Sequence, residues 1–180
     1  WTRSLGTVAS EEAYDAVLTQ DGGFAIFGYE NSPGGDAVLI KTNSAGSQQW
    51  IQMYDGGGWE LGRSLVETWD GGFVLTGRKE NPANNNQMWL IRVDVAGVFM
   101  WDRTYPSGMM SEGDDIHTTS DGGFIIAGGN NSSGDIGQTY LVKTESAGWV
   151  SIVDDANLSP DFLLCYNQST EYITLRFAEA

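Results

Sequence analysis

Three copies of one short pattern, Asp-Gly-Gly-Phe followed by an apolar run that ends in glycine, divide this chain into repeats. The copies begin at Asp21, Asp70 and Asp121, so that successive copies start 49 and 51 residues apart. A period of this length is typical of repeat architectures, in which each copy is a supersecondary unit that packs on its neighbour. We therefore expect three tandem β-repeats within residues 1–152, at about 1–50, 51–101 and 102–152.

Each repeat has the pattern of four short strands. In the first repeat the strands are predicted at residues 14–20, 24–28 and 37–42, with a fourth around Trp50. The Asp-Gly-Gly turn joins the first two strands, because a tight hairpin needs the positive φ that glycine adopts easily. Aspartate hydrogen-bonds its own turn backbone, so we interpret these aspartates as turn formers and not as metal ligands. The turn residues are Asp21, Gly22 and Gly23, then Asp70, Gly71 and Gly72, then Asp121, Gly122 and Gly123.

The second and third strands of each repeat are nearly continuous apolar runs. Leu39, Leu90 and Leu141 hold the same place in these runs, at intervals of 51 residues. Strands with this composition are usually buried on both faces, which favours packed sheets. No segment carries the i, i+3, i+4, i+7 stripe of an amphipathic helix, so the expected class is all-β.

The C-terminal segment, residues 153–180, does not carry the repeat. It contains two predicted strands, at 161–166 and 172–177, joined by a polar connection. A divergent terminal unit is normal in a repeat array, where the last unit covers an otherwise exposed face. We expect this segment to complete a sheet in the same chain or in a neighbouring one.

The complete pattern also includes a polar loop, a run ending in Lys-Thr, and then Ala-Gly and tryptophan. It resembles the β-propeller-type repeats, about fifty residues long, of bacterial and archaeal secreted and cell-surface proteins. The resemblance covers residues 1–152 and implies four-stranded blades, an extracellular or cell-surface setting and a scaffolding or adhesive role, with no particular catalytic residues. The segments that end in Trp50 and Trp101 also resemble the tryptophan-docking motif of quinoprotein propellers. Trp1 stands 49 residues before Trp50, and Ile152 replaces the third tryptophan.

The number of repeats leaves the closure of the array open. Propellers usually have four to eight blades, so three repeats do not easily close a ring. A composite fourth blade, strand addition between chains into a ring or filament, and a place within a longer protein are all consistent with the pattern. A β-trefoil is the alternative fold, since Gln48-Gln49-Trp50 matches the Gln-x-Trp signature of ricin-like lectins, although Phe99-Met100-Trp101 does not.

The charge of the chain excludes several classes of partner. The 180 residues include 24 acidic and 9 basic side chains, for a net charge of −15. Nucleic acid and anionic membrane surfaces need a basic partner, so neither is expected. No apolar run is long enough for a transmembrane helix. The single cysteine, Cys165, allows no disulfide within the chain, and we expect it to be a buried apolar residue.

No catalytic, cofactor-binding or metal-binding residues are predicted. His117 is the only histidine, and it occupies the place of Val17 and Val66 in the other repeats, so we expect a substituted strand position. The acidic residues Glu112, Asp114 and Asp115 match no recognised calcium loop, and a solvated edge is the expected role. The protein is therefore not expected to be an enzyme.

Two groups of residues are candidates for contact with sugars. Asn130, Asn131 and Asn167 fit the N-glycosylation triplet, whereas the triplet at Asn157 is weakened by the following proline. Tryptophans that do not recur between repeats are candidate sugar-stacking platforms. These are Trp59, Trp69, Trp89 and Trp149.

The function expected from these features is that of a non-enzymatic extracellular or cell-surface structural or adhesive protein. The incomplete repeat count favours a homo-oligomer or filament built through sheet-edge contacts. The competing function is that of a carbohydrate-binding module with a propeller or trefoil fold. Converging polar and aromatic residues in one pocket would favour the carbohydrate-binding module.

Overall fold

The computed structural model describes residues 1–7, 9–31, 34–105, 110–131 and 137–150, and the backbone of two strands beyond them. The chain divides into two compact units, Trp1–Trp149 and Val150–Ala180. The second unit contains an antiparallel hairpin of β12 (Phe162–Asn167) and β13 (Tyr172–Phe177), which confirms the two strands predicted there.

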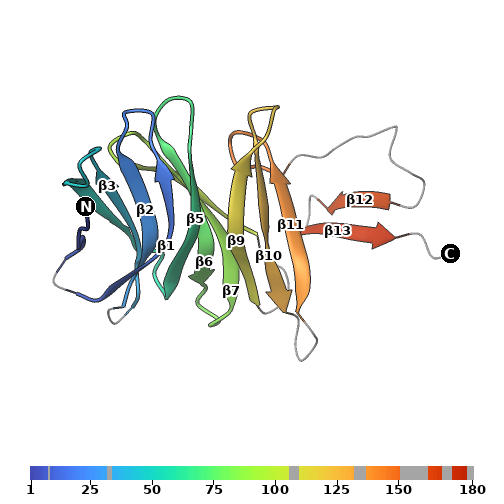
Figure 1. The fold of residues 1–180 in the computed structure, drawn as a ribbon. Coiled ribbons are helices and arrows are strands. Elements are labelled where there is room, and N and C mark those ends of the chain that lie inside the picture. The colour runs from blue at the N-terminus through green and yellow to red at the C-terminus, as the bar shows by residue number, and fades with distance from the viewer. Residues whose placement is uncertain are drawn as a thin grey trace. The chain divides into compact units, whose positions relative to one another are not determined.

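The strands of the first unit follow one another as antiparallel meanders (Figure 1). The first repeat forms a four-stranded sheet of β1 (Glu11–Leu18), β2 (Phe24–Glu30), β3 (Ala37–Thr42) and β4 (Gln48–Tyr54). The second repeat has the same order in β5 (Glu60–Glu67), β6 (Phe73–Glu80), β7 (Asn86–Val93) and β8 (Phe99–Tyr105). The third repeat contributes β9 (Met110–Thr118), β10 (Phe124–Asn131) and β11 (Gln138–Thr144), followed by a bridge at Val150.

The first strands of the three repeats lie next to one another. β5 is in contact with β1 and β2 on one side and with β9 on the other, as Figure 1 shows. One parallel pairing, between Asn86 and Met110, also joins β7 to β9, so that the second and third repeats share a sheet. The repeats therefore meet through their first strands.

The all-β class is confirmed, and no helix occurs in the part of the chain that the structure describes. β3 has the predicted bounds, and β2 extends two residues beyond its prediction. β1 begins and ends earlier than predicted, because Thr19 already belongs to the Asp-Gly-Gly turn, where its N–H donates to the carbonyl of Gly23. No helix of the described residues is both long and apolar enough to cross a membrane.

The main core lies between the first and second repeats. Phe27 and Leu39 from the first repeat pack with Leu65, Phe73 and Leu75 from the second. Every residue of β3 is buried, as predicted for a strand covered on both faces.

The same prediction is wrong for the third repeat. Leu39 and Leu90 are 0% exposed, whereas Leu141, at the equivalent place in β11, is 58% exposed. All of β3 and the last six residues of β7 are buried, whereas β11 is exposed at several positions, Leu141 among them. Apolar composition alone does not distinguish the last repeat from the inner ones.

Each first strand contains a β-bulge at the same place. The register shifts beside Tyr14 in β1, Arg63 in β5 and Asp114 in β9. A bulge leaves one residue unpaired and turns the neighbouring side chains out of the regular alternation. The bulges therefore place the side chains that follow them at the contact between repeats.

Candidate functional site

The Asp-Gly-Gly turns are built as predicted, with aspartate bonded to its own turn. The Oδ1 atom of Asp21 accepts hydrogen bonds from the N–H of Gly23 at 2.9 Å and from the hydroxyl of Thr19 at 2.6 Å. Gly22 has a φ of 81°, in the left-handed region that favours glycine. The other two turns repeat these contacts with Asp70 and Asp121.

The same aspartates form ion pairs that the sequence analysis did not predict. The Asp21 carboxylate lies 2.8 Å from the ammonium of Lys41, which comes from the third strand of the repeat. The corresponding cations are Arg92 for Asp70 and Lys143 for Asp121, both at 2.7 Å. The hydrogen bond from Lys41 is the main cause that lowers the pKa of Asp21. The signal was present in the sequence, because a basic residue follows the second apolar run of every repeat.

Tryptophan links each repeat to the next. The indole of Trp50 lies against Gly97 in the turn after β7, with Cζ3 only 2.8 Å from the place of a β-carbon on that glycine. Trp50 also meets the ring of Phe73 edge to face, with centroids 6.2 Å apart. Trp1 packs on Gly46 and Trp101 on Gly148 in the same way. The three contacts support a tryptophan-docking role for these repeat-equivalent residues.

A tyrosine hydroxyl holds the same turn. Tyr54 donates to the carbonyl of Gly97 at 2.9 Å, and Tyr105 donates to that of Gly148 at 2.5 Å. Burial raises the pKa of both tyrosines. Each turn is thus bound by an indole and a phenol of the preceding repeat.

A polar contact joins the three first strands directly after their bulges. The hydroxyl of Ser64 in β5 lies 2.8 Å from Asp15 in β1 and 3.2 Å from Asp115 in β9. Asp15 also accepts the backbone N–H of Leu65 at 3.1 Å. These side chains occupy the same place in their repeats, so one serine connects all three.

The acidic cluster of the third repeat is partly paired, which corrects the expectation of a solvated edge. Glu112 accepts from the guanidinium groups of Arg63 and Arg78, and its side chain is only 19% exposed. Arg63 also stacks on Tyr14, with Cζ 4.5 Å from the ring centroid. Asp114 stays more exposed, and burial followed by the charge of Glu112 raises its pKa.

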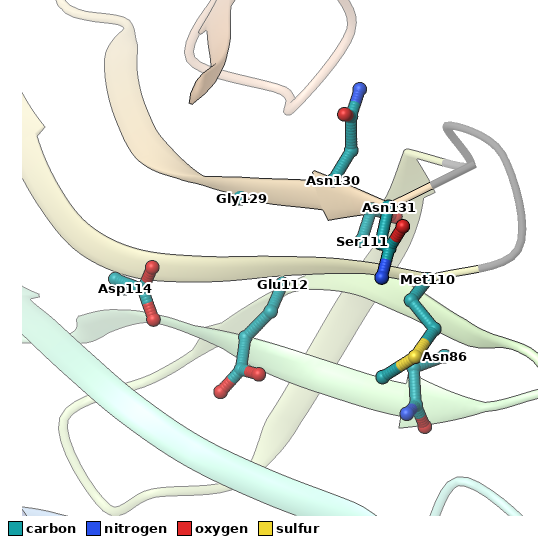
Figure 2. A pocket seen from close by; sticks show the side chains of 8 residues that line it. All are labelled: Asn86, Met110, Ser111, Glu112, Asp114, Gly129, Asn130 and Asn131. Carbon is teal, nitrogen blue, oxygen red and sulfur yellow. The ribbon is translucent and has the colours of Figure 1, made fainter. Parts of the chain in front are cut away.

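Glu112 also lines a pocket of about 200 Å³ where β9 begins and β10 ends (Figure 2). Glu112 points to one side of these strands, and Asn130 points to the other. The remaining lining residues are Asn86, Met110, Ser111, Asp114, Gly129 and Asn131. This lining combines amides with carboxylates, and His117 is not part of it. The pocket brings together two of the three candidate glycosylation residues, Asn130 and Asn131.

The candidate sugar-stacking tryptophans are spread over the fold. Trp69 is 92% exposed at the tip of the β5–β6 turn, and Trp149 is exposed with the guanidinium of Arg103 4.0 Å from its ring. Trp59 borders the loop before β5. Trp89 is buried, and its indole N–H donates to Asp102 at 2.8 Å, which leaves no face for a sugar.

The remaining predicted residues lie on β9, β10 and β12. His117 is exposed on β9, with Nε2 3.2 Å from the carboxylate of Asp115. Asn130 and Asn131 end β10. Asn167 and Cys165 belong to β12, and their side chains lie outside the described residues.

One group of carboxylates was missed by the sequence analysis, which predicted no metal site. Asp36, Asp55 and Glu60 each place a carboxylate oxygen within 4.8 Å of the other two. They belong to two loops and the first residue of β5, and no local motif contains all three. Among the described residues this group is the best candidate for holding a metal ion.

The family models and the curated proteins compared with this chain contain no match for it.

Proposed function

We propose that this chain is a non-enzymatic structural or adhesive protein of the extracellular space or cell surface that assembles with copies of itself. In this proposal the repeats are propeller-like blades, and an incomplete array is continued by another chain. The meander order of the strands supports blades over the hairpin pattern of a trefoil.

The observation that carries this proposal is the exposure of Leu141. The equivalent Leu39 and Leu90 are completely buried, and Leu141 is 58% exposed on β11. An exposed apolar side chain at a place that is buried in the other repeats is a candidate contact for another chain. The third repeat therefore presents a surface that corresponds to an interior contact of the first two.

The occupant that fits this surface is the N-terminal segment of a second copy. Residues 1–5 correspond by the repeat period to 50–54 in β4, and yet they belong to no strand. In the first two repeats, β4 and β8 cover the outer edges of β3 and β7. A contact between the start of one chain and the third repeat of another is heterologous, so it produces rings or filaments.

The test is the native mass of the full chain, measured by light scattering together with electron micrographs. We expect particles of several chains for the unchanged protein and mainly single 19.5 kDa chains for Leu141→Lys. The matched control is Val95→Lys, because Val95 is 62% exposed on a turn away from β11. A circular dichroism spectrum typical of strands should be kept by both variants.

A 19.5 kDa monomer at all concentrations would contradict the assembly proposal. An equal loss of association in both variants would also contradict it, since the contact would then not involve β11.

A carbohydrate-binding function is the second candidate, and Trp69 favours it. This indole is almost fully exposed at a turn where the other repeats carry Gln20 and Ser120. A glycan-binding screen should then give hits that Trp69→Ala abolishes. Hits that survive this substitution would exclude Trp69 as the platform.

A further inference from the structure

The first residue of β5 is a buried carboxylate. The side chain of Glu60 is 0% exposed, although glutamate is rarely buried without a partner. Its Oε1 atom accepts the N–H of Gly58 at 3.1 Å. Its Oε2 atom is also buried and has no hydrogen-bond partner among the described residues. Leaving an ionised oxygen in this state is costly, so the position points to a missing ligand.

The side chains nearest to Glu60 include further carboxylates, which do not neutralise its charge. Asp36, from the loop before β3, and Asp55, from the loop after β4, have oxygens within 4.8 Å of it and of each other. Glu80 lines an open pocket together with Asp36 and Asp55. The cation on the adjacent strand, Lys79, pairs with Asp102 at 3.3 Å. The carboxylates therefore face one another without a counter-charge among the described contacts.

At the equivalent position in the third repeat, a neutral side chain forms all its hydrogen bonds within the protein. Ser111 stands 51 residues after Glu60. Its hydroxyl oxygen accepts the N–H of Met88 at 2.9 Å and donates to the carbonyl of Tyr105 at 3.0 Å. The junction between the second and third repeats is thus satisfied by the protein alone, and the junction at Glu60 is not.

We propose that Asp36, Asp55 and Glu60 bind a calcium ion that links the first repeat to the second. Calcium accepts six to eight oxygen ligands in flexible geometry, so loop carboxylates with water in the remaining positions suit it. Magnesium needs a stricter octahedron and gives up its water reluctantly.

Residues beside these ligands are held by backbone hydrogen bonds and by ring packing. The N–H of Glu60 donates to the carbonyl of Gly35 at 2.7 Å, which joins the two repeats beside the site. The ring of Trp59 packs against Gly35, which has a φ of 51°. Asp55 accepts the N–H of Gly57 at 2.7 Å. Binding therefore needs little further ordering of the chain.

The first measurement is thermal unfolding of the full chain in EDTA, in calcium and in magnesium. At calcium about a hundredfold above its Kd, we expect the Tm to rise by about 5 to 10 °C. Magnesium should give a much smaller rise. An equal response to the two ions, or no response to either, would overturn the calcium assignment.

The difference in Tm between Glu60→Gln and the unchanged protein should change sign when calcium is added, which a purely structural role would not produce. In EDTA it should unfold at a higher temperature than the unchanged protein, because it removes a buried charge. In calcium it should unfold at a lower temperature, because a ligand is lost. An unchanged order in the two conditions would overturn the proposal.

Terbium luminescence provides a direct readout of binding, since Trp59 borders the pocket and can sensitise a bound lanthanide. Asp36→Asn should weaken terbium binding at least tenfold. The control Asp114→Asn removes a charge from the other acidic cluster and should bind as the unchanged protein does. Trp59→Phe should lower the terbium luminescence, while calcium should still raise the Tm of this variant. Equal binding by Asp36→Asn and the control would place the ion elsewhere.

Discussion

Trp50 of the first repeat lies on Gly97 of the second, with Cζ3 of the indole 2.8 Å from the place that a β-carbon would take. The glycine is therefore required for two reasons, namely its φ of 75° and the closeness of the ring. The same relationship joins Trp1 to Gly46 and Trp101 to Gly148.

The first prediction separates these two reasons. Gly97→Ala should lower the free energy of unfolding by about 1–2 kcal/mol for the backbone alone, with a further loss from displacing the indole. Gly22→Ala is the matched control, because Gly22 has a φ of 81° and no atom near its missing β-carbon. Urea unfolding of both variants measures the difference. Equal losses would show that the indole moves without cost.

The second prediction concerns the ion pair between Asp21 and Lys41. Asp21→Asn leaves the ammonium of a buried lysine without its carboxylate. We expect a loss of about 1 kcal/mol at pH 7, since Asp21 itself is half exposed and partly screened. Glu145→Gln, on an exposed turn, is the control and should have little effect.

The third prediction gives the acid dependence of the same contacts. The pKa values of Asp21, Asp70 and Asp121 are lowered in the folded protein, so the unfolded chain binds more protons below about pH 5. Their stabilisation is therefore present above the unfolded pKa and is lost as the pH falls through the folded values. Urea midpoints between pH 6 and pH 2 should fall less steeply for Asp21→Asn than for the unchanged protein. Parallel curves would exclude Asp21 as a contributor.

Much of this fold follows from patterns that can be read locally. The Asp-Gly-Gly turns, the bounds of β3 and the four-strand order depend on turn chemistry and on apolar runs, which act over a few residues. The tryptophan contacts were also indicated, because Trp1, Trp50 and Trp101 recur with the repeat.

The sequence did not reveal features that depend on which side chains meet across repeats. Leu141 lies in an apolar run equivalent to that of Leu39, and yet it is exposed on β11 whereas Leu39 is buried. Glu60 is separated from Asp36 by 24 positions and lies in another repeat. The first repeat carries Glu11 at the same place and the third carries Ser111, so the sequence does not single Glu60 out, and only its burial does.

The fourth prediction tests the tyrosine contacts with the turns. Tyr54→Phe should lower the free energy of unfolding by about 1 kcal/mol, because the carbonyl of Gly97 loses its donor. Tyr105→Phe affects the next junction, so the double variant should lose about the sum of the two.

Since burial raises the pKa of both phenols, their stabilisation is present below the unfolded pKa, near 10, and is lost as the pH rises through the folded values. Ultraviolet titration should show two fewer late-ionising tyrosines in the double variant.

The last prediction concerns the serine that joins all three repeats. Ser64→Ala removes the hydroxyl between Asp15 and Asp115, so that two carboxylates face each other without a shared donor. We expect a loss of about 1–2 kcal/mol in the free energy of unfolding at low salt. Each carboxylate keeps a backbone N–H, from Leu65 and Ile116, which limits the loss.

Because the remaining effect of Ser64→Ala is repulsion between like charges, the loss of unfolding free energy should shrink as salt is raised towards 1 M. The exposed Ser44→Ala should show no such salt dependence in the same urea titrations. A loss in Ser64→Ala that stays constant with salt would mean that the hydrogen bond, and not the facing charges, dominates this junction.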